Sequence, residues 1–502
     1  MSEDLKGTNW LDRIIGFFNP EKAYRRIAFR QAYSSGETHR RQDGWMPVDG
    51  NVERLNAMSR EIIRRKARDL ERNSDIMNSL LEAFERNVVG SGFVPQADTG
   101  DEELNNKIEA VFKEWSKPKN CDISGTQSFN EMCNMIVRRL KIDGGILLLK
   151  TYDGNPKYPF QLQAREVSDL DGDSVVSYRH EGKSVVGGVE VNDYGKPLAY
   201  WIKQETPDGW STLETKRIPA DRVISLWEKK SPSQIREISP MSQAITRIAD
   251  AEDYLDTISL KEKILACFGV FIKRALPSGG LGRGVNNIDR KTGLPSKTVT
   301  PGMIQELQPG DEAQAVVPNG QASNAKDMLS IMIRLVGSGA GLSYEAISRD
   351  MSQVNYSSAR QGFLEDKRTY ERIQRYLIDH FLDTVYEDVI ASAVASKTLH
   401  IPDFWENKEK YLKHSWNTSG WDWIDPVKEV RANKIAIESN QETLATVCAK
   451  SGMDWKELIK QRAAEAVYIK KLEDEYGITL KGGVNNDETD ETYGNAAAGN
   501  SD

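Results

Sequence analysis

Hydrophobic positions follow a helical period through much of the chain and change to a strand-like period in one central stretch. Helical spacing predicts a helix over 52–89 that stops at Gly90-Ser91-Gly92, because glycine favours a helix C-terminus. Two more helices are predicted, at 102–115 and 129–142. Short β-type runs separated by turn residues follow, at 145–152, 160–164, 185–191, 198–204 and 222–227. These patterns predict an α+β domain with a hairpin-rich sheet.

A long helix is predicted from Ser239-Pro240 to about Cys267, since proline fits the first turn of a helix. Its apolar residues make a narrow seam with spacings of 3, 4, 3 and 7: Ile248, Ala251, Leu255, Ile258 and Leu265. Much of the remaining helix surface is acidic. So narrow a seam is typical of a helix packed in a bundle or against neighbouring copies in a ring. We therefore predict that Ile248, Leu255 and Ile258 mediate this packing.

The second half alternates long helices with polar segments. Residues 268–325 are predicted to be a compact insert, with β runs at 270–273 and 313–317 around a Gly-rich loop at 279–287. Helix returns at 327–336, a polar loop spans Ser348–Ser357, and the longest helical pattern covers 358–395. A mostly helical, Trp-rich region follows. The acidic, Gly/Asn-rich residues after Lys481 are predicted to be disordered.

The net charge argues against a protein that binds nucleic acid tightly. The 502 residues carry a formal net charge of −8, whereas tight binders usually present a basic face to the phosphates. A basic run over 60–72 (Arg60, Arg64, Arg65, Lys66, Arg68 and Arg72) has two interpretations, a nucleic-acid-binding helix or a solvated face. Interleaved Glu61, Asp69 and Glu71 favour the solvated face.

Neither the cysteines nor the apolar stretches indicate an extracellular or membrane-spanning protein. The four cysteines are far apart and form no CxxC pair, which favours a reducing compartment. No stretch approaches 18 apolar residues, so no transmembrane helix is predicted. The segment Trp10–Phe18 is interpreted as an arm that docks on its own or a neighbouring subunit, with an interfacial membrane helix as the alternative.

Motifs for catalysis and cofactor binding are incomplete. Gly182-Lys183-Ser184 resembles the end of a phosphate-binding loop, but Ser177 stands where that loop needs glycine. The run Gly280–Gly284 lacks the spacing and the following helix of a dinucleotide fingerprint. His380 and Asp383 lie one turn apart and are interpreted as a solvated or helix-bridging pair, not as a metal or acid–base pair. We therefore expect no catalytic residue, no cofactor and no metal.

Several local strings resemble the lambda-type portal protein family of tailed bacteriophages. They run in order over roughly residues 60–470: Arg68-Asp69-Leu70 with Val88-Val89-Gly90-Ser91-Gly92, Gly187-Gly188-Val189-Glu190 with Gly195-Lys196-Pro197, Gln234-Ile235-Arg236 before Ile238-Ser239-Pro240, Pro301-Gly302-Met303-Ile304, Tyr344-Glu345-Ala346-Ile347, Asn355-Tyr356-Ser357-Ser358, and Trp423-Ile424-Asp425-Pro426. One departure is Glu237, which stands where glycine is expected.

The resemblance implies the portal fold. Its parts would be an N-terminal arm (1–56), a wing (57–235), a stem helix (236–267), a clip (268–325), a return stem helix (326–341), a tunnel loop (342–357), a long wing or channel helix (358–395), a helical crown-side region (396–481) and a disordered acidic tail (482–502). The tunnel loop would face DNA with Arg349, Ser352, Gln353, Asn355 and Ser357. The clip would contact the packaging motor through Arg283 and Arg290.

The resemblance also implies a function without catalysis. A homo-oligomeric ring, usually of twelve subunits, would sit at one capsid vertex of the virion after assembly in the host cytoplasm. It would pass double-stranded DNA during packaging and ejection. Its partners would be the terminase large subunit, the major capsid protein with scaffold or protease, and head–tail connector proteins, with no membrane. Two rival interpretations are a nucleic-acid-processing enzyme and a peripheral membrane scaffold.

Overall fold

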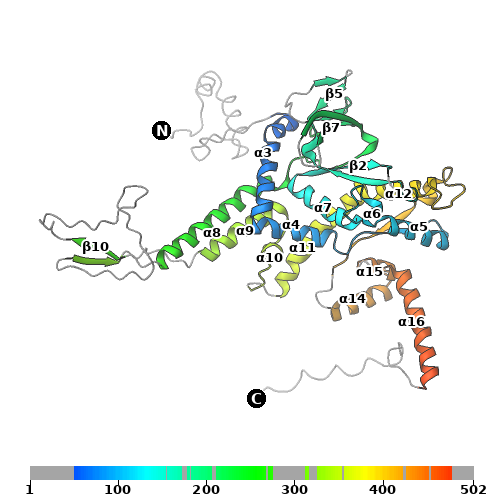
Figure 1. Ribbon diagram of the computed structural model, residues 1–502. Helices are drawn as coiled ribbons and strands as arrows, with labels where there is room; N and C mark the ends of the chain where they lie inside the picture. Colours follow the sequence, from blue (N-terminus) through cyan, green and yellow to red (C-terminus); the bar gives the residue numbers. More distant parts are fainter. Residues whose placement is uncertain are drawn as a thin grey trace, which may run out of the picture. The chain divides into compact units, whose positions relative to one another are not determined.

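The computed structural model describes residues 50–153, 155–171, 178–180, 183–205, 211–266, 270–274, 311–315, 325–352, 356–421, 426–450 and 454–477. The chain divides into two units, residues 1–51 and residues 52–502. Only the last two residues of the first unit are described, so the predicted arm and the Trp10–Phe18 helix lie outside the described residues. All named helices and strands belong to the second unit (Figure 1).

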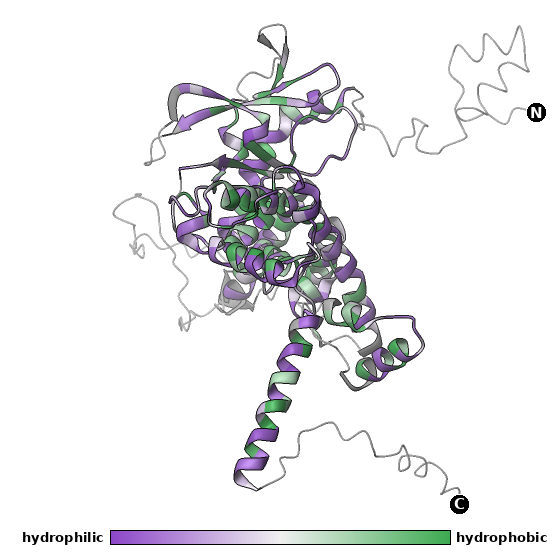
Figure 2. Ribbon diagram, turned by 90° about the vertical axis from the view of Figure 1, so that its right-hand side faces the viewer, coloured by the Kyte–Doolittle hydropathy of each residue, from purple (hydrophilic) through white to green (hydrophobic). Residues whose placement is uncertain are grey.

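A layer of helices forms the main core. It consists of α3 (Val52–Asn73), α4 (Asp75–Val88), α5 (Glu102–Trp115), α6 (Pro118–Cys121), α7 (Phe129–Ile142) and a long helix over 356–395. The single helix predicted over 52–89 is two helices, because the Ser74 side chain accepts a hydrogen bond from Met77 N and starts a new helix. The predicted α5 and α7 are confirmed. Figure 2 shows hydrophobic residues concentrated in this helical layer.

Two antiparallel sheets follow the helices. The first has the order β3-β2-β9 and the second the order β4-β5-β6-β7-β8. Their strands are β2 (Gly145–Thr151), β3 (Gln161–Arg165), β4 (Tyr178–His180), β5 (Lys183–Val186), β6 (Val189–Val191), β7 (Pro197–Glu205), β8 (Ser211–Pro219) and β9 (Val223–Trp227), with the short 3₁₀ turns η3 (Val167–Asp169) and η4 (Ala220–Arg222) beside them. The run predicted at 185–191 is a hairpin, since Gly187 and Gly188 turn the chain with φ of 54° and 84°. Strands β4 and β8 were not predicted.

Strand β2 lies between two hydrophobic cores. Its side chains alternate, so that Ile146 and Leu148 pack into the helical core while Leu147 and Leu149 pack toward the five-stranded sheet. Because both faces of β2 are covered, its sequence reads as a continuous apolar run. A further two-stranded sheet pairs β1 (Val94–Ala97) with β12 (His414–Asn417). The predicted α+β class is confirmed.

Helices α8 (Ile245–Ala266) and α9 (Ala325–Ala340) lie side by side in Figure 1, and we call them the stem pair. The 3₁₀ turn η5 (Pro240–Gln243), started by Ser239 and proline, precedes α8. In the sequence between these two helices, strands β10 (Val270–Arg274) and β11 (Asp311–Ala315) form an antiparallel pair. Strand β11 begins two residues before the run predicted at 313–317. Helix α10 (Tyr344–Ser348) follows α9, within the segment predicted as tunnel loop.

The longest predicted helix is confirmed, with one interruption. It comprises α11 (Tyr356–Leu377), a π turn η7 (Ile378–Leu382) and α12 (Asp383–Ala395). Its apolar residues are spaced by four, wider than the 3.6-residue helical repeat, yet all are buried: Ile373, Leu377, Phe381, Val385 and Val389. The π turn has more residues per turn than an α-helix, so it offsets part of the difference between four and 3.6 residues. The five apolar residues therefore stay on one face of the helix.

The C-terminal region is helical, as predicted, apart from β12. It contains α13 (Lys408–Tyr411), α14 (Pro426–Glu438), α15 (Leu444–Lys450) and α16 (Trp455–Tyr476). Hydrophobic and hydrophilic residues alternate along α16 in Figure 2. The predicted tail at 482–502 lies outside the described residues.

Candidate assembly and channel surfaces

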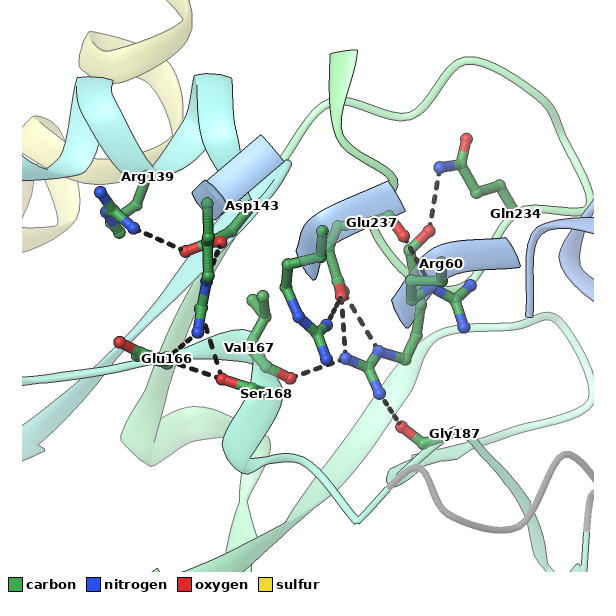
Figure 3. A network of polar contacts seen from close by, with 12 residues as sticks. Arg60, Arg139, Asp143, Glu166, Val167, Ser168, Gly187, Gln234 and Glu237 are labelled. Atoms are coloured by element: carbon green, nitrogen blue, oxygen red, sulfur yellow. Dashed lines mark hydrogen bonds and ion pairs between the residues drawn. The ribbon is translucent and has the colours of Figure 1, made fainter. Parts of the chain in front are cut away.

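A buried ionic network holds the segment that leads into α8 (Figure 3). Arg236 and Glu237 are 4% and 2% exposed, and the Arg236 guanidinium donates to Glu237 Oε1 at 2.8 Å and Oε2 at 3.1 Å. The same guanidinium donates to the carbonyl oxygens of Val167 at 2.8 Å and Gly187 at 2.5 Å. Because these carbonyls belong to η3 and to the β5–β6 turn, the network ties the start of the stem pair to both sheets.

Helix α3 supplies further arginines to this network. Arg60 Nε donates to the Glu237 carbonyl oxygen at 2.7 Å and its guanidinium pairs with Glu53, while Arg64 lies 3.8 Å from Glu237 Oε1. Burial lowers the pKa of Arg64 in spite of the nearby Glu237. Glu237, the departure from the family strings, is therefore the anion that balances Arg236 and Arg64, while Glu53 balances Arg60.

The remaining basic residues of the run over 60–72 divide into two groups. Arg68 pairs with Asp143 at 2.6 Å and with Glu166 at 2.7 Å. Arg65, Lys66 and Arg72 are exposed, and the two arginines pair with acidic residues of α3 itself. The solvated-face interpretation is confirmed for these three and wrong for Arg60, Arg64 and Arg68, each of which contacts a residue of a distant segment.

The stem pair exposes apolar side chains along its length. In α8, Ile248 is fully buried within the chain, Ile258 is half-buried and Leu255 is 43% exposed. Of the three predicted packing residues, Leu255 and Ile258 are therefore the ones accessible to a neighbour. In α9, Met328, Ile331 and Leu335 follow a spacing of 3 and 4 and are 43%, 50% and 43% exposed. This stripe was missed, although its helical spacing is visible in the sequence.

Two of the five predicted tunnel-loop residues, Arg349 and Ser352, are described in the segment after α10. Arg349 has a left-handed backbone with φ of 56° and donates to Glu82 Oε2 at 2.7 Å, so its charge is balanced by α4. Asp350, whose pKa is lowered by hydrogen bonds from Ser352, accepts from Ser352 N at 2.9 Å. Gln353 and Asn355 lie outside the described residues. Ser357 belongs to α11, which begins two residues earlier than predicted.

The predicted clip contacts cannot be placed, since Arg283, Arg290 and the Gly279–Asn287 loop lie outside the described residues. What is described of this insert is the β10–β11 pair.

His380 and Asp383 do not form a pair. Asp383 Oδ1 contacts His414 Nε2 at 3.2 Å and accepts from Trp416 Nε1 at 2.8 Å, while the His380 ring lies 4.6 Å from that of Tyr376. The described residues contain no group of three histidines, cysteines or carboxylates able to hold a metal ion. Among the described helices, none is long and apolar enough to cross a membrane.

Two described cysteines of the helical core are inert as nucleophiles. Cys121 and Cys133 are buried, and burial raises the pKa of the Cys121 thiol to about 12 and that of Cys133 further. Since the thiolate is the reactive form, these residues serve packing.

Comparison with known proteins assigns the family. The model of the family described as phage portal protein, lambda family, matches residues 38–374. A probable portal protein of Halomonas phage phiHAP-1 is 25% identical over 461 residues, covering 88% of this chain and 88% of that protein. Portal protein B of Escherichia phage lambda is 23% identical over 446 residues, covering 80% of this chain and 83% of that protein. A chain in the solved virion of a native gene transfer agent particle aligns with 78% of this chain at 11% identity, with a TM-score of 0.42. Since the family model spans most of the sequence, the chain belongs to the lambda family of phage portal proteins, which are structural components of the virion and not enzymes.

Proposed function

We propose that this protein assembles into a ring, of twelve copies as the family resemblance implies, and that the ring is the channel for double-stranded DNA at one capsid vertex. The ring would pass DNA inward during packaging and outward during ejection. It would also be the platform on which the terminase large subunit and the head–tail connector proteins dock, surrounded by the major capsid protein.

The observation that carries the proposal is the apolar surface of the stem pair. The α9 stripe and Leu255 of α8 are between 43% and 50% exposed, and Leu260 is 58% exposed. Exposed apolar side chains at regular helical spacing, as in the α9 stripe, are typical of a surface that packs against another protein. A ring in which each stem pair packs against the next would cover them.

The charge distribution supports a channel through which DNA passes and not a surface that binds DNA tightly. Each phosphate that a protein neutralises adds affinity, and affinity for a moving duplex would act as friction. Here the buried arginines of α3 are neutralised within the chain, and the net charge is −8. A wall without a large excess of free cations suits a channel.

Negative-stain microscopy of the purified full-length protein tests the assembly. We expect rings with a central hole. Monomers or small dimers over a wide range of protein concentration and salt would contradict the proposal.

The tunnel loop is proposed to face the DNA. The segment lies between α10 and the long helix, Met351 and Ser352 are exposed, and the charge of Arg349 is already balanced by Glu82. Its polar residues Ser352, Gln353, Asn355 and Ser357 are proposed to make brief hydrogen bonds to passing phosphates.

Gln353→Lys combined with Asn355→Lys should slow packaging in vitro by about tenfold at low ionic strength, with recovery as salt rises, because each added cation contributes salt-dependent phosphate affinity. The matched control, Gln353→Ser with Asn355→Ser, should package like the wild type. Ring assembly should be unchanged in both. Wild-type rates and salt dependence from the lysine variant would show that the loop does not meet DNA.

The clip is proposed to contact the terminase through Arg283 and Arg290. Its support is the position of the insert between the two stem helices, together with the polar, Gly-rich composition typical of functional loops.

A further inference from the structure

A polar pocket of about 720 Å³ opens where the stem pair meets the helical core. It is lined by the end of α7, the residues after β9, η5, the last turn of α9, and one side of α11. Five cationic side chains line it, against two acidic ones. The cations are Lys141, Lys229, Lys230, Arg372 and Arg375, and the acids are Glu228 and Asp379.

One of the two acids, Glu228, already forms an ion pair within the pocket. Arg372 Nη1 donates to Glu228 Oε1 at 2.8 Å, which neutralises one cation. Asp379 is the remaining acid against Lys141, Lys229, Lys230 and Arg375. The pocket therefore has an excess of positive charge, and three of the four cations outside the Arg372–Glu228 pair are exposed at the rim.

Lys141 is the buried member of the set. It is 7% exposed, and its ammonium group lies 4.2 Å from the centre of the Phe84 ring. Within the described part of the chain its Nζ has no hydrogen bond or ion pair. Burial, opposed by Glu228 and aided by Arg372 and Lys230, lowers the pKa of Lys141 to about 8. Because Lys141 lines the pocket and has no ion pair among the described residues, an anion that enters the pocket would supply it with a partner.

Helix α8 carries the complementary charge. Asp250, Asp253 and Asp256 are exposed, recur every three residues, and form no ion pair among the described residues; we call them the acidic row. In a head-to-tail ring, each copy presents one patch to one neighbour and a different patch to the other. An uncompensated basic pocket and an uncompensated acidic row are patches of this kind.

We propose that the pocket binds carboxylates of the acidic row on a second copy of this chain, with Lys141 as the buried anchor of the contact. The proposal rests on the proposed ring assembly and names a surface that joins its members. A DNA phosphate is the less favoured occupant, since a buried cation holding the duplex would oppose its movement.

Charge reversal on each side tests the pairing. The pocket variant is Lys230→Glu with Arg375→Glu, both at the exposed rim, and the row variant is Asp253→Lys with Asp256→Lys. Each variant should raise the protein concentration needed for half-assembly by about tenfold or more in 0.1 M salt, measured by native mass spectrometry. The quadruple variant, in which both sides are reversed, should assemble within about threefold of the wild type.

Lys141→Met separates a binding role from a structural one. Removing an uncompensated buried charge should raise the melting temperature at pH 7, whereas loss of the anchor should weaken assembly. A lower melting temperature together with unchanged assembly would assign Lys141 to folding alone and overturn its role as anchor.

The other outcomes are equally decisive. Rings unaffected by either reversal, or a quadruple variant no better than the doubles, would overturn the pairing. If the pocket variant no longer binds inorganic phosphate in ³¹P NMR while its rings stay intact, the pocket is a phosphate site instead. Failure of the wild type to form any ring would contradict the proposed function itself, and the pocket proposal with it.

Discussion

Leu255→Asp should convert rings of this protein into monomers or disordered aggregates while each chain stays folded. Leu255 is 43% exposed in the isolated chain, so a charge there meets water and the fold tolerates it. In a ring the same position would lie in an apolar contact, where an unpaired carboxylate costs about 3 kcal/mol or more. Such a loss weakens each contact by about a hundredfold, and every copy in a ring has two contacts.

Size-exclusion chromatography with light scattering and circular dichroism would measure this outcome. The control is Leu255→Met, which keeps an apolar side chain of similar size at the same position. We expect rings from the control. Normal rings from Leu255→Asp would remove this part of α8 from the assembly surface.

Glu237→Leu should destabilise the fold strongly, by about 3 to 5 kcal/mol. The change leaves the buried Arg236 without its bidentate partner and Arg64 without its nearest anion. For a protein of this size the expected fall in melting temperature is about 3 to 5 °C, measured by calorimetry at fixed protein concentration.

Two further variants show whether the burial of the charge causes the destabilisation by Glu237→Leu. Glu61→Leu removes an exposed ion pair with Arg65 on the same helix α3 and should change stability by less than about 0.5 kcal/mol. Arg236→Met combined with Glu237→Leu removes both charges and should be less destabilising than the sum of the two single changes. Additive losses would mean that the two side chains do not act as a pair.

The sequence by itself determined the helices, most of the strands and the family. Apolar periodicity is a local property, so α5, α7, α8 and the long helix could be predicted within a few residues of their bounds. Even the spacing by four that accompanies the π turn can be read in the chain from Ile373 to Val389. The interruption itself could not be predicted, because a single wide turn changes no residue type.

Only the tertiary structure decided which charges are free. Arg60 and Glu237 are 177 residues apart in sequence, and no local pattern indicates that they meet. The same limit applies to Lys141, which reads as an ordinary surface lysine near the end of a helix and is buried by segments from η5, α9 and α11. The strength of an ion pair, the pKa of a lysine and the exposure of an apolar stripe depend on what the rest of the chain places around them, and that environment exists only after folding.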